Sequence, residues 1–122
     1  MSTEETVLEF ATASFRSVWA LELLLALKRR GGQVCKSSDM IKDLRGSRVV
    51  VTEALNDLIA AGLVIGDEID GYRYQPGSQT IDEMVAELEK LYALRPVSVI
   101  GTIVSSPTAK LRILSDAFRI KK

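Results

Sequence analysis

The segment from Ser14 to Arg30 constrains the fold of this chain more than any other feature of the sequence. At about 100° per residue of an α-helix, its apolar side chains point nearly all round the helix axis. These side chains are Phe15, Val18, Trp19, Leu21, Leu23, Leu24, Leu25 and Leu27. A helix that is apolar on several sides must be covered by other elements on each of them. The run Lys28-Arg29-Arg30 and the two following glycines indicate where it stops, because cations favour the negative end of the helix dipole and glycine tolerates positive φ.

The length of 122 residues is that of one domain, so we expect a single domain over 1–122, with a core over 14–76 and additional helices over 78–122. Hydrophobic residues make up 47% of the chain and charged residues 26%, which is typical of a folded soluble protein and excludes a disordered one. The N-terminus lacks a basic and apolar signal segment, and no apolar run approaches the roughly 20 residues of a transmembrane helix. We therefore expect a cytoplasmic protein without a membrane partner.

The chain offers little for catalysis or metal binding. It contains no histidine, which removes the commonest general base near neutral pH and the commonest metal ligand. Cys35 is the only cysteine, so it forms neither an intramolecular bridge nor a multi-cysteine metal site. We interpret it as a small buried thiol, with a redox-sensing thiolate as the alternative. No nucleophile is paired with a base and no phosphate-binding loop is present, so neither an enzyme nor a cofactor is expected.

Two helices are expected in the middle of the chain. Residues 33–36 suit a short strand, after which Ser37 or Ser38 offers an N-cap for a helix of about two turns that Gly46 closes. The next helix begins at Ser47 as N-cap. One of its faces belongs to the core and carries Val51, Leu55, Leu58 and Gly62. The opposite side presents Val49, Thr52, Glu53, Asn56, Asp57 and Ala60.

A β-hairpin follows these helices. The segments 63–69 and 72–75 flank Asp70-Gly71, a pair that tolerates the positive φ values of a two-residue turn. Such a turn places Glu68 opposite Arg73, so that the guanidinium is neutralised by its cross-strand neighbour.

The C-terminal third indicates three further helices. Ser78 or Thr80 caps the first, whose apolar residues repeat at alternating spacings of three and four and so imply a partner helix. This seam consists of Ile81, Met84, Val85, Leu88, Leu91 and Tyr92. Pro96 begins a second short helix, for which a strand is the alternative because of its β-branched residues. Ser106 and Pro107 begin the last, with Leu111, Leu114 and Phe118 in line. The tail also holds an excess of bases that either steers a polyanion or solubilises a helix end: Lys110, Arg112, Arg119, Lys121 and Lys122.

The order helix, short strand, helix, helix, hairpin resembles the winged helix-turn-helix. The segment VTEALNDLIAAGLV (51–64) is similar to that family's recognition helix running into its wing, because two leucines lock the helix onto the preceding helices and Gly62 ends it. The resemblance covers residues 15–76, and within this superfamily the chain resembles transcriptional regulators of the MarR and ArsR types. It implies a mainly α fold with a small β-hairpin wing and additional C-terminal helices. It also implies a homodimer, which the seam at 81–92 supports independently.

The resemblance implies that a recognition helix over about 47–61 enters the major groove of duplex DNA. Its base-facing residues are then Arg48, Val49, Thr52, Glu53 and Asn56, with Ser47 at a phosphate. Asn56 suits adenine, Glu53 accepts from the cytosine amino group and Val49 packs on a thymine methyl. Arg48 is the only cation of this helix, while Glu53 and Asp57 repel the DNA backbone.

Further backbone contacts are expected from Lys36, Ser37, Ser38 and Lys42, at and within the preceding helix, for which capping and solubility are the alternative roles. The wing offers Arg73 as its one cation among Asp67, Glu68 and Asp70, whereas DNA-binding wings normally present lysine or arginine. Arg73 is a further candidate for DNA binding, with the pairing to Glu68 as the alternative to a phosphate contact.

These observations lead to the hypothesis of a sequence-specific DNA-binding regulator of transcription. The sixteen basic and sixteen acidic residues cancel, so no broad attraction to nucleic acid assists it. The alternative is a winged-helix interaction module that docks a protein partner through the acidic wing and the apolar residues Val49, Val50 and Ala60. The residues indicate no particular small-molecule effector.

Overall fold

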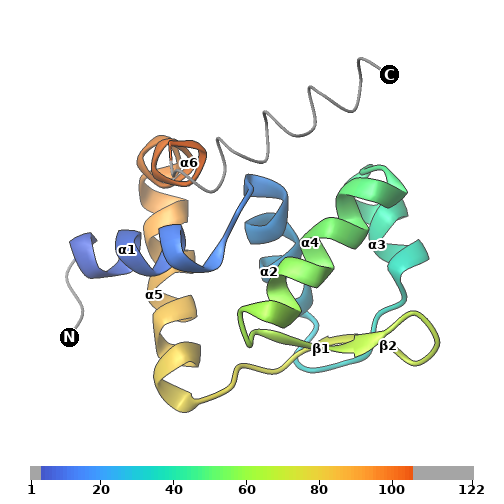
Figure 1. Ribbon diagram of the computed structural model, residues 1–122. Helices are drawn as coiled ribbons and strands as arrows, with labels where there is room; N and C mark the ends of the chain where they lie inside the picture. The colour runs from blue at the N-terminus through green and yellow to red at the C-terminus, as the bar shows by residue number, and fades with distance from the viewer. Residues whose placement is uncertain (1–3, 106–122) are drawn as a thin grey trace.

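The computed structural model describes residues 4–105, which form six helices and one two-stranded antiparallel hairpin (Figure 1). In chain order the elements are α1 (Glu4–Ser14), α2 (Val18–Arg29), α3 (Ser37–Leu44), α4 (Arg48–Ala60), β1 (Val64–Asp67), β2 (Gly71–Tyr74), α5 (Gln79–Leu94) and α6 (Pro96–Val104). The expected mainly α fold with a small hairpin is confirmed at this level. The predicted last helix, with its basic residues, lies outside the described range.

Helix α2 lies at the centre of the core, but the predicted coverage on all sides is incomplete, because Trp19 is 39% exposed and Val18 is only partly buried. Its buried residues are Ala20, Leu21, Leu23, Leu24, Leu25 and Leu27. Helix α4 and strand β2 pack on it, and α6 reaches it as well. The glycines after it adopt positive φ values of 64° and 89°, as expected of this stop.

The predicted start of this helix at Ser14 is wrong. The side chain of Ser17 accepts a hydrogen bond from the backbone N–H of Ala20 at 3.2 Å, and α2 therefore begins at Val18. Residues before this cap belong to α1, which meets α2 across a bend of 103°. Phe15 lies in the bend and is fully buried.

Helix α1 was not anticipated, because only Val7 and Ala11 bury their side chains among its eleven residues. These two positions lie one turn apart on one face, which packs against α5 and α6. The helix forms through this tertiary packing, and its isolated sequence carries only a weak apolar stripe.

Both ends of α3 differ from the prediction. Lys36 is the N-cap residue and makes no side-chain capping bond, so Ser37 and Ser38 stand inside the helix. Arg45 ends it in the left-handed region at φ 54°, so the helix closes one residue before the predicted Gly46. Gly46 is instead pressed against the core, because a Cβ there would lie 3.2 Å from the Trp19 ring and 3.3 Å from Val51.

Helix α4 follows the prediction closely on its buried side. The Ser47 side chain accepts from the backbone N–H of Val50 at 3.1 Å. Val51, Leu55 and Leu58 are buried, and Gly62 adopts φ 76° beyond the end of the helix.

The hairpin register corrects the predicted turn. Asp67 pairs with Gly71 and Ile65 pairs with Arg73, so the loop holds three residues, 68–70. The Asp67 carboxylate accepts from the backbone N–H groups of Ile69 at 2.9 Å and Asp70 at 2.7 Å, which favours this longer loop over the two-residue turn. The expected strand at 33–36 is reduced to one bridge, in which Cys35 exchanges two backbone hydrogen bonds with Tyr72.

The seam of α5 packs within its own chain. Val85 and Leu88 are fully buried, and the helices that cover α5 are α1 and α6. Ile81, Met84, Leu91 and Tyr92 are partly buried. The expectation that Val85 and Leu88 form a dimer interface is therefore wrong, because no surface of either remains for a second subunit. Ser78 caps α5, and residues 96–104 form the predicted helix rather than the alternative strand.

Leu88→Ala and Leu94→Ala test this packing, since the same substitution is made on one helix at a buried and an exposed site. Leu88 is 0% exposed and Leu94 is 81% exposed. We expect Leu88→Ala to lower the free energy of unfolding by about 2–5 kcal/mol in urea titrations, because it leaves a cavity. At protein concentrations too low for association, Leu94→Ala is expected to change it by less than about 0.5 kcal/mol, because the exposed side chain is not buried within its own chain. Equal effects would contradict the placement of α5.

Alkaline unfolding tests the contact between α5 and α2, where the hydroxyl of Tyr92 donates to Glu22. Burial, together with this hydrogen bond, raises the pKa of Tyr92 to about 12. The contribution is complete below the ordinary tyrosine pKa of about 10 and is lost as pH rises through the folded value. Urea titrations at increasing pH should therefore show a smaller alkaline loss of stability for Tyr92→Phe than for the wild type. An equally steep loss in both would show that this bond contributes nothing.

Candidate nucleic-acid interface

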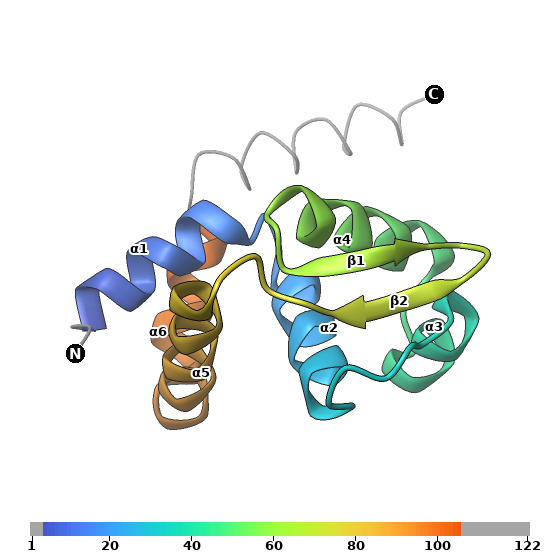
Figure 2. The same ribbon diagram turned by 90° about the horizontal axis from the view of Figure 1, so that it is seen from below.

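Helix α3, the N-terminal half of α4 and the hairpin loop lie together at one end of the molecule, away from α1, α5 and α6 (Figures 1 and 2). Helix α3 also contacts α4 directly. The chain thus brings three separate predicted contact segments to the same end.

The outward residues of α4 are largely where the sequence predicted. Ser47, Arg48, Val49 and Asn56 are exposed, and Val49 is 62% exposed. Thr52 and Glu53 are partly buried. A protruding helix face with one arginine, one amide and one exposed valine can present donors, acceptors and apolar contact to base edges.

Asp57 departs from the prediction that it faces outward. It is only 8% exposed, and its carboxylate lies 3.9 Å from the Arg16 guanidinium. One of the two acids expected to repel a phosphate backbone is therefore turned toward the body of the protein. In an ideal helix Asp57, two residues after Leu55, lies between the core face and the outer face. The apolar spacing of α4 therefore placed it incorrectly.

Three cations lie in the last turn of α3, the residue after it and the first turn of α4. Lys42, Arg45 and Arg48 are exposed, and none forms an ion pair with another residue in 4–105. Asp43, the acid nearest to them in sequence, is bound by Arg30 at 2.7 Å. Sequence reasoning missed Arg45 because it lies between helices. Its left-handed conformation before Gly46 became evident only in the structure.

Ser37 and the neighbouring Lys36 serve a different purpose from the phosphate contact that was expected of this segment. The Ser37 hydroxyl donates to the Glu68 carboxylate at 2.8 Å, and the Lys36 ammonium donates to the carbonyl of Ile69. The hydroxyl of Tyr72 donates to the other oxygen of Glu68 at 3.3 Å. These bonds hold the hairpin loop against the start of α3. Ser38 is exposed beside them.

Arg73 is exposed and lies opposite Ile65 in the hairpin. The predicted pairing with Glu68 is therefore wrong, and Glu68 takes its hydrogen bonds from Ser37 and Tyr72 instead. The hairpin loop keeps the negative charges of Asp67, Glu68 and Asp70.

Cys35 is buried beneath the hairpin and 2% exposed. Burial raises the pKa of its thiol above the ordinary value, and the nearby positive charge of Arg30 opposes that shift only partly. A raised thiol pKa favours the structural interpretation over a redox-sensing thiolate. Among residues 4–105, no group of three cysteine, aspartate or glutamate side chains is placed to hold a metal ion.

Comparison of the chain with protein-family models, curated proteins and solved structures finds no match in any of the three. Within the described part of the chain no single helix has the length and apolar character to cross a membrane. Helices α1 and α2 meet that criterion only when they are counted together across their bend.

Ser37→Ala and Ser38→Ala test how the hairpin loop is held. Ser37→Ala removes the hydrogen bond to Glu68, whereas Ser38 is the matched neighbour with no hydrogen bond to another described residue. A net hydrogen bond is worth about 1 kcal/mol, so we expect roughly fivefold faster amide hydrogen exchange at Ile69 and Asp70 in Ser37→Ala. Ser38→Ala should leave these amides unchanged. Unchanged exchange in both variants would show that the Ser37 bond does not hold the loop.

Proposed function

We propose that this protein is a winged helix-turn-helix regulator of transcription that binds duplex DNA with α4 in the major groove. In this assignment α2, α3 and α4 form the three helices of the motif, Cys35 supplies its short strand, and β1 and β2 form the wing. The mainly helical fold with one small hairpin is compatible with that layout. The resemblance of residues 51–64 to a recognition helix supports it further.

The observation that carries the proposal is that three exposed cations, Lys42, Arg45 and Arg48, lie in the last turn of α3, the residue after it and the first turn of α4. The helix N-terminus adds a partial positive charge, and Ser47 keeps a hydroxyl proton to donate after accepting from Val50. Phosphates therefore have three guanidinium or ammonium groups and a hydroxyl at this end. Val49 and Asn56 lie on the same helix for base contact.

The negative charge of the wing restricts where a phosphate backbone can be bound. Asp67, Glu68 and Asp70 repel a phosphate backbone, and Arg73 is the single cation of the hairpin. We therefore assign the backbone contacts to α3 and the start of α4, with Ser38 and Lys42 beside Arg45 and Arg48. The wing then contributes Arg73 alone.

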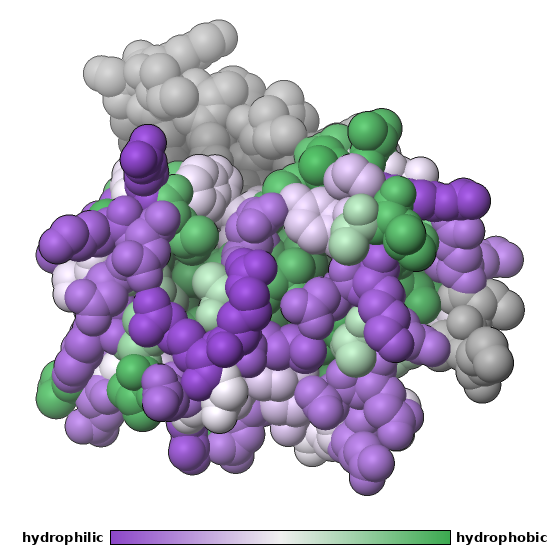
Figure 3. Space-filling model, turned by 180° about the vertical axis from the view of Figure 1, so that it is seen from behind, coloured by the Kyte–Doolittle hydropathy of each residue, from purple (hydrophilic) through white to green (hydrophobic). Residues whose placement is uncertain are grey.

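A homodimer belongs to the same proposal, with an interface that differs from the seam of α5. Viewed from behind, the surface is largely hydrophilic, and hydrophobic residues gather toward the end formed by α5 and α6 (Figure 3). Leu94 and Val97, 81% and 82% exposed, flank the turn between these helices. We propose that two subunits meet there, which leaves both copies of α4 free.

A titration of labelled duplex DNA by fluorescence anisotropy, repeated across a salt series, tests the proposal. We expect log affinity to fall linearly with log salt, with a slope of about 0.9 for each phosphate neutralised. Arg48→Ala should weaken binding to all sequences and reduce the slope by about 1. Lys90→Ala removes the same charge from α5 and should change neither quantity. At saturation, two chains per duplex are expected.

Asn56→Ala separates base reading from phosphate binding in the same titration. It should lower affinity by about 1–3 kcal/mol at one base position and leave the salt slope unchanged. Equal losses for Arg48→Ala and Lys90→Ala would reveal charge-driven binding without a defined site.

The second candidate is a protein-interaction module of the same fold. Ile69 is 83% exposed at the tip of the acidic hairpin loop, and Val49 is 62% exposed on α4. Ile69 stands among the carboxylates of Asp67, Glu68 and Asp70, a setting that suits a basic protein surface better than a phosphate backbone. Absence of any binding to DNA at low salt, with the protein folded, would favour this function.

A further inference from the structure

Residues 45–47 form the turn between α3 and α4, and its glycine is not the residue with positive φ. Arg45 adopts φ 54°, whereas Gly46 lies outside the left-handed region. Ser47 follows in an extended conformation, with φ −77° and ψ 160°, and caps α4. The φ value alone therefore does not exclude a side chain at position 46. Glycine is required there by the atoms that a side chain would meet.

The indole ring of Trp19 and the side chain of Val51 close the space beside Gly46. A Cβ at this position would lie 3.2 Å from Cζ3 and 3.4 Å from Cη2 of Trp19, and 3.3 Å from Cγ2 of Val51. Carbon atoms in favourable contact lie about 3.5–4.0 Å apart. A methyl group on Gly46 would therefore displace either the side chains or the turn.

Trp19 makes this contact at the surface. Val51 is buried on the core face of α4, and Ala20, which follows Trp19 on α2, is buried as well. Trp19 itself is exposed. A tryptophan left partly in water gains less from apolar burial than one in the core. The contact with Gly46 distinguishes this side chain from the leucines of α2, which serve the core.

The same turn carries groups that the proposed function assigns to phosphates. Arg45 and Ser47 are the chain neighbours of Gly46, and Arg48 follows. A left-handed φ is unfavourable for arginine, so it persists only where the surroundings determine it. Packing of Gly46 against two side chains provides such surroundings. Binding groups must be held to within about 0.5 Å, so a small displacement of the turn is sufficient to misplace them.

We propose that Trp19 is a positioning residue for the DNA-binding end of the molecule. Its ring packs against Gly46 and thereby fixes where Arg45, Ser47 and Arg48 present their donors. Trp19 acts through the turn and need not touch DNA. The phosphate ligand rests on the proposed function, whereas the packing of the turn does not.

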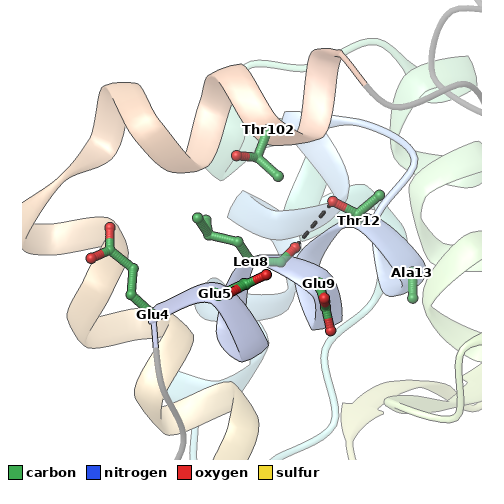
Figure 4. Close-up of a pocket in the computed structure, with 7 residues that line it drawn as sticks. All are labelled: Glu4, Glu5, Leu8, Glu9, Thr12, Ala13 and Thr102. Atoms are coloured by element: carbon green, nitrogen blue, oxygen red, sulfur yellow. Dashed lines mark hydrogen bonds between the residues drawn. The ribbon is translucent and has the colours of Figure 1, made fainter.

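Gly46→Ala and Gly77→Ala test the packing without DNA. A Cβ at Gly77 would lie 3.6 Å or more from its neighbours, so the same substitution meets only ordinary contacts there. The backbone N–H of Val50 donates to Oγ of Ser47, so its hydrogen exchange reports on the position of Ser47. We expect about fivefold faster exchange at Val50 in Gly46→Ala and unchanged exchange in Gly77→Ala. Amides around Leu8 of α1, which faces α6 away from the turn (Figure 4), should exchange as in the wild type in both variants.

Trp19→Leu tests whether the ring is the cause. Leucine keeps an apolar side chain on α2 but lacks the ring edge that faces Gly46. In this background we expect Gly46→Ala to accelerate exchange at Val50 by less than about twofold. A fivefold effect in both backgrounds would overturn the proposal, because Val51 would then hold the turn without the ring. Unchanged exchange at Val50 in Gly46→Ala would also overturn it. A shift in the emission of Trp19, the chain's only tryptophan, would in that case show that the ring yields to the turn.

The anisotropy titration connects this packing to phosphate binding. Gly46→Ala leaves every charge in place, and we expect it to weaken binding to all duplex sequences about tenfold, with wild-type affinity for Gly77→Ala. Wild-type affinity of Gly46→Ala despite faster exchange at Val50 would refute the positioning role. If the wild type itself binds no duplex DNA, the proposed function fails, and exchange at Val50 still decides whether Trp19 holds the turn.

Discussion

The burial of the leucine-rich part of α2, Ala20 to Leu27, is the constraint on which the rest of the structure depends. Each fully buried leucine contributes about 1.5–3 kcal/mol relative to an exposed one, and α2 carries several. Elements must surround this helix for that free energy to be gained. Helix α4 and strand β2 cover one part of it, and helix α6 covers another. The N-terminal half of α4 is left to project from the core with its outer face exposed.

Polar contacts then determine the positions of the surrounding elements. Asp67 closes the hairpin loop through two backbone amides, and Glu68 receives the hydroxyls of Ser37 and Tyr72. These carboxylates stabilise the hairpin and at the same time keep its tip negative. On the other side of the core, Lys28 binds Glu89 at 2.8 Å and ties α2 to α5. Apart from Lys36 and Arg73, the cations of the candidate interface that form no ion pair with another residue in 4–105 lie at the end of α3 and the start of α4.

The candidate site was predictable where it depends on helical periodicity. The exposed positions of Ser47, Arg48, Val49 and Asn56 follow from the burial of Val51, Leu55 and Leu58 on the opposite face. Arg45 was not predictable, because its exposure depends on a left-handed turn between two helices. The role of Ser37 was also hidden, since its partner Glu68 lies 31 residues away and no local pattern indicates such a contact.

The sequence by itself determined the number and kind of elements over most of the chain. Local physics decides these features: apolar spacing, serine caps at Ser47 and Ser78, and glycine after a helix end. Only the tertiary structure decided that α1 is a helix, that the hairpin loop holds three residues, and that the α5 seam packs inside its own chain. An apolar stripe specifies that it must be covered but carries no information about which surface covers it. Which surface covers the stripe depends on the arrangement that buries α1, α5 and α6 together. That arrangement is determined by contacts between distant parts of the chain.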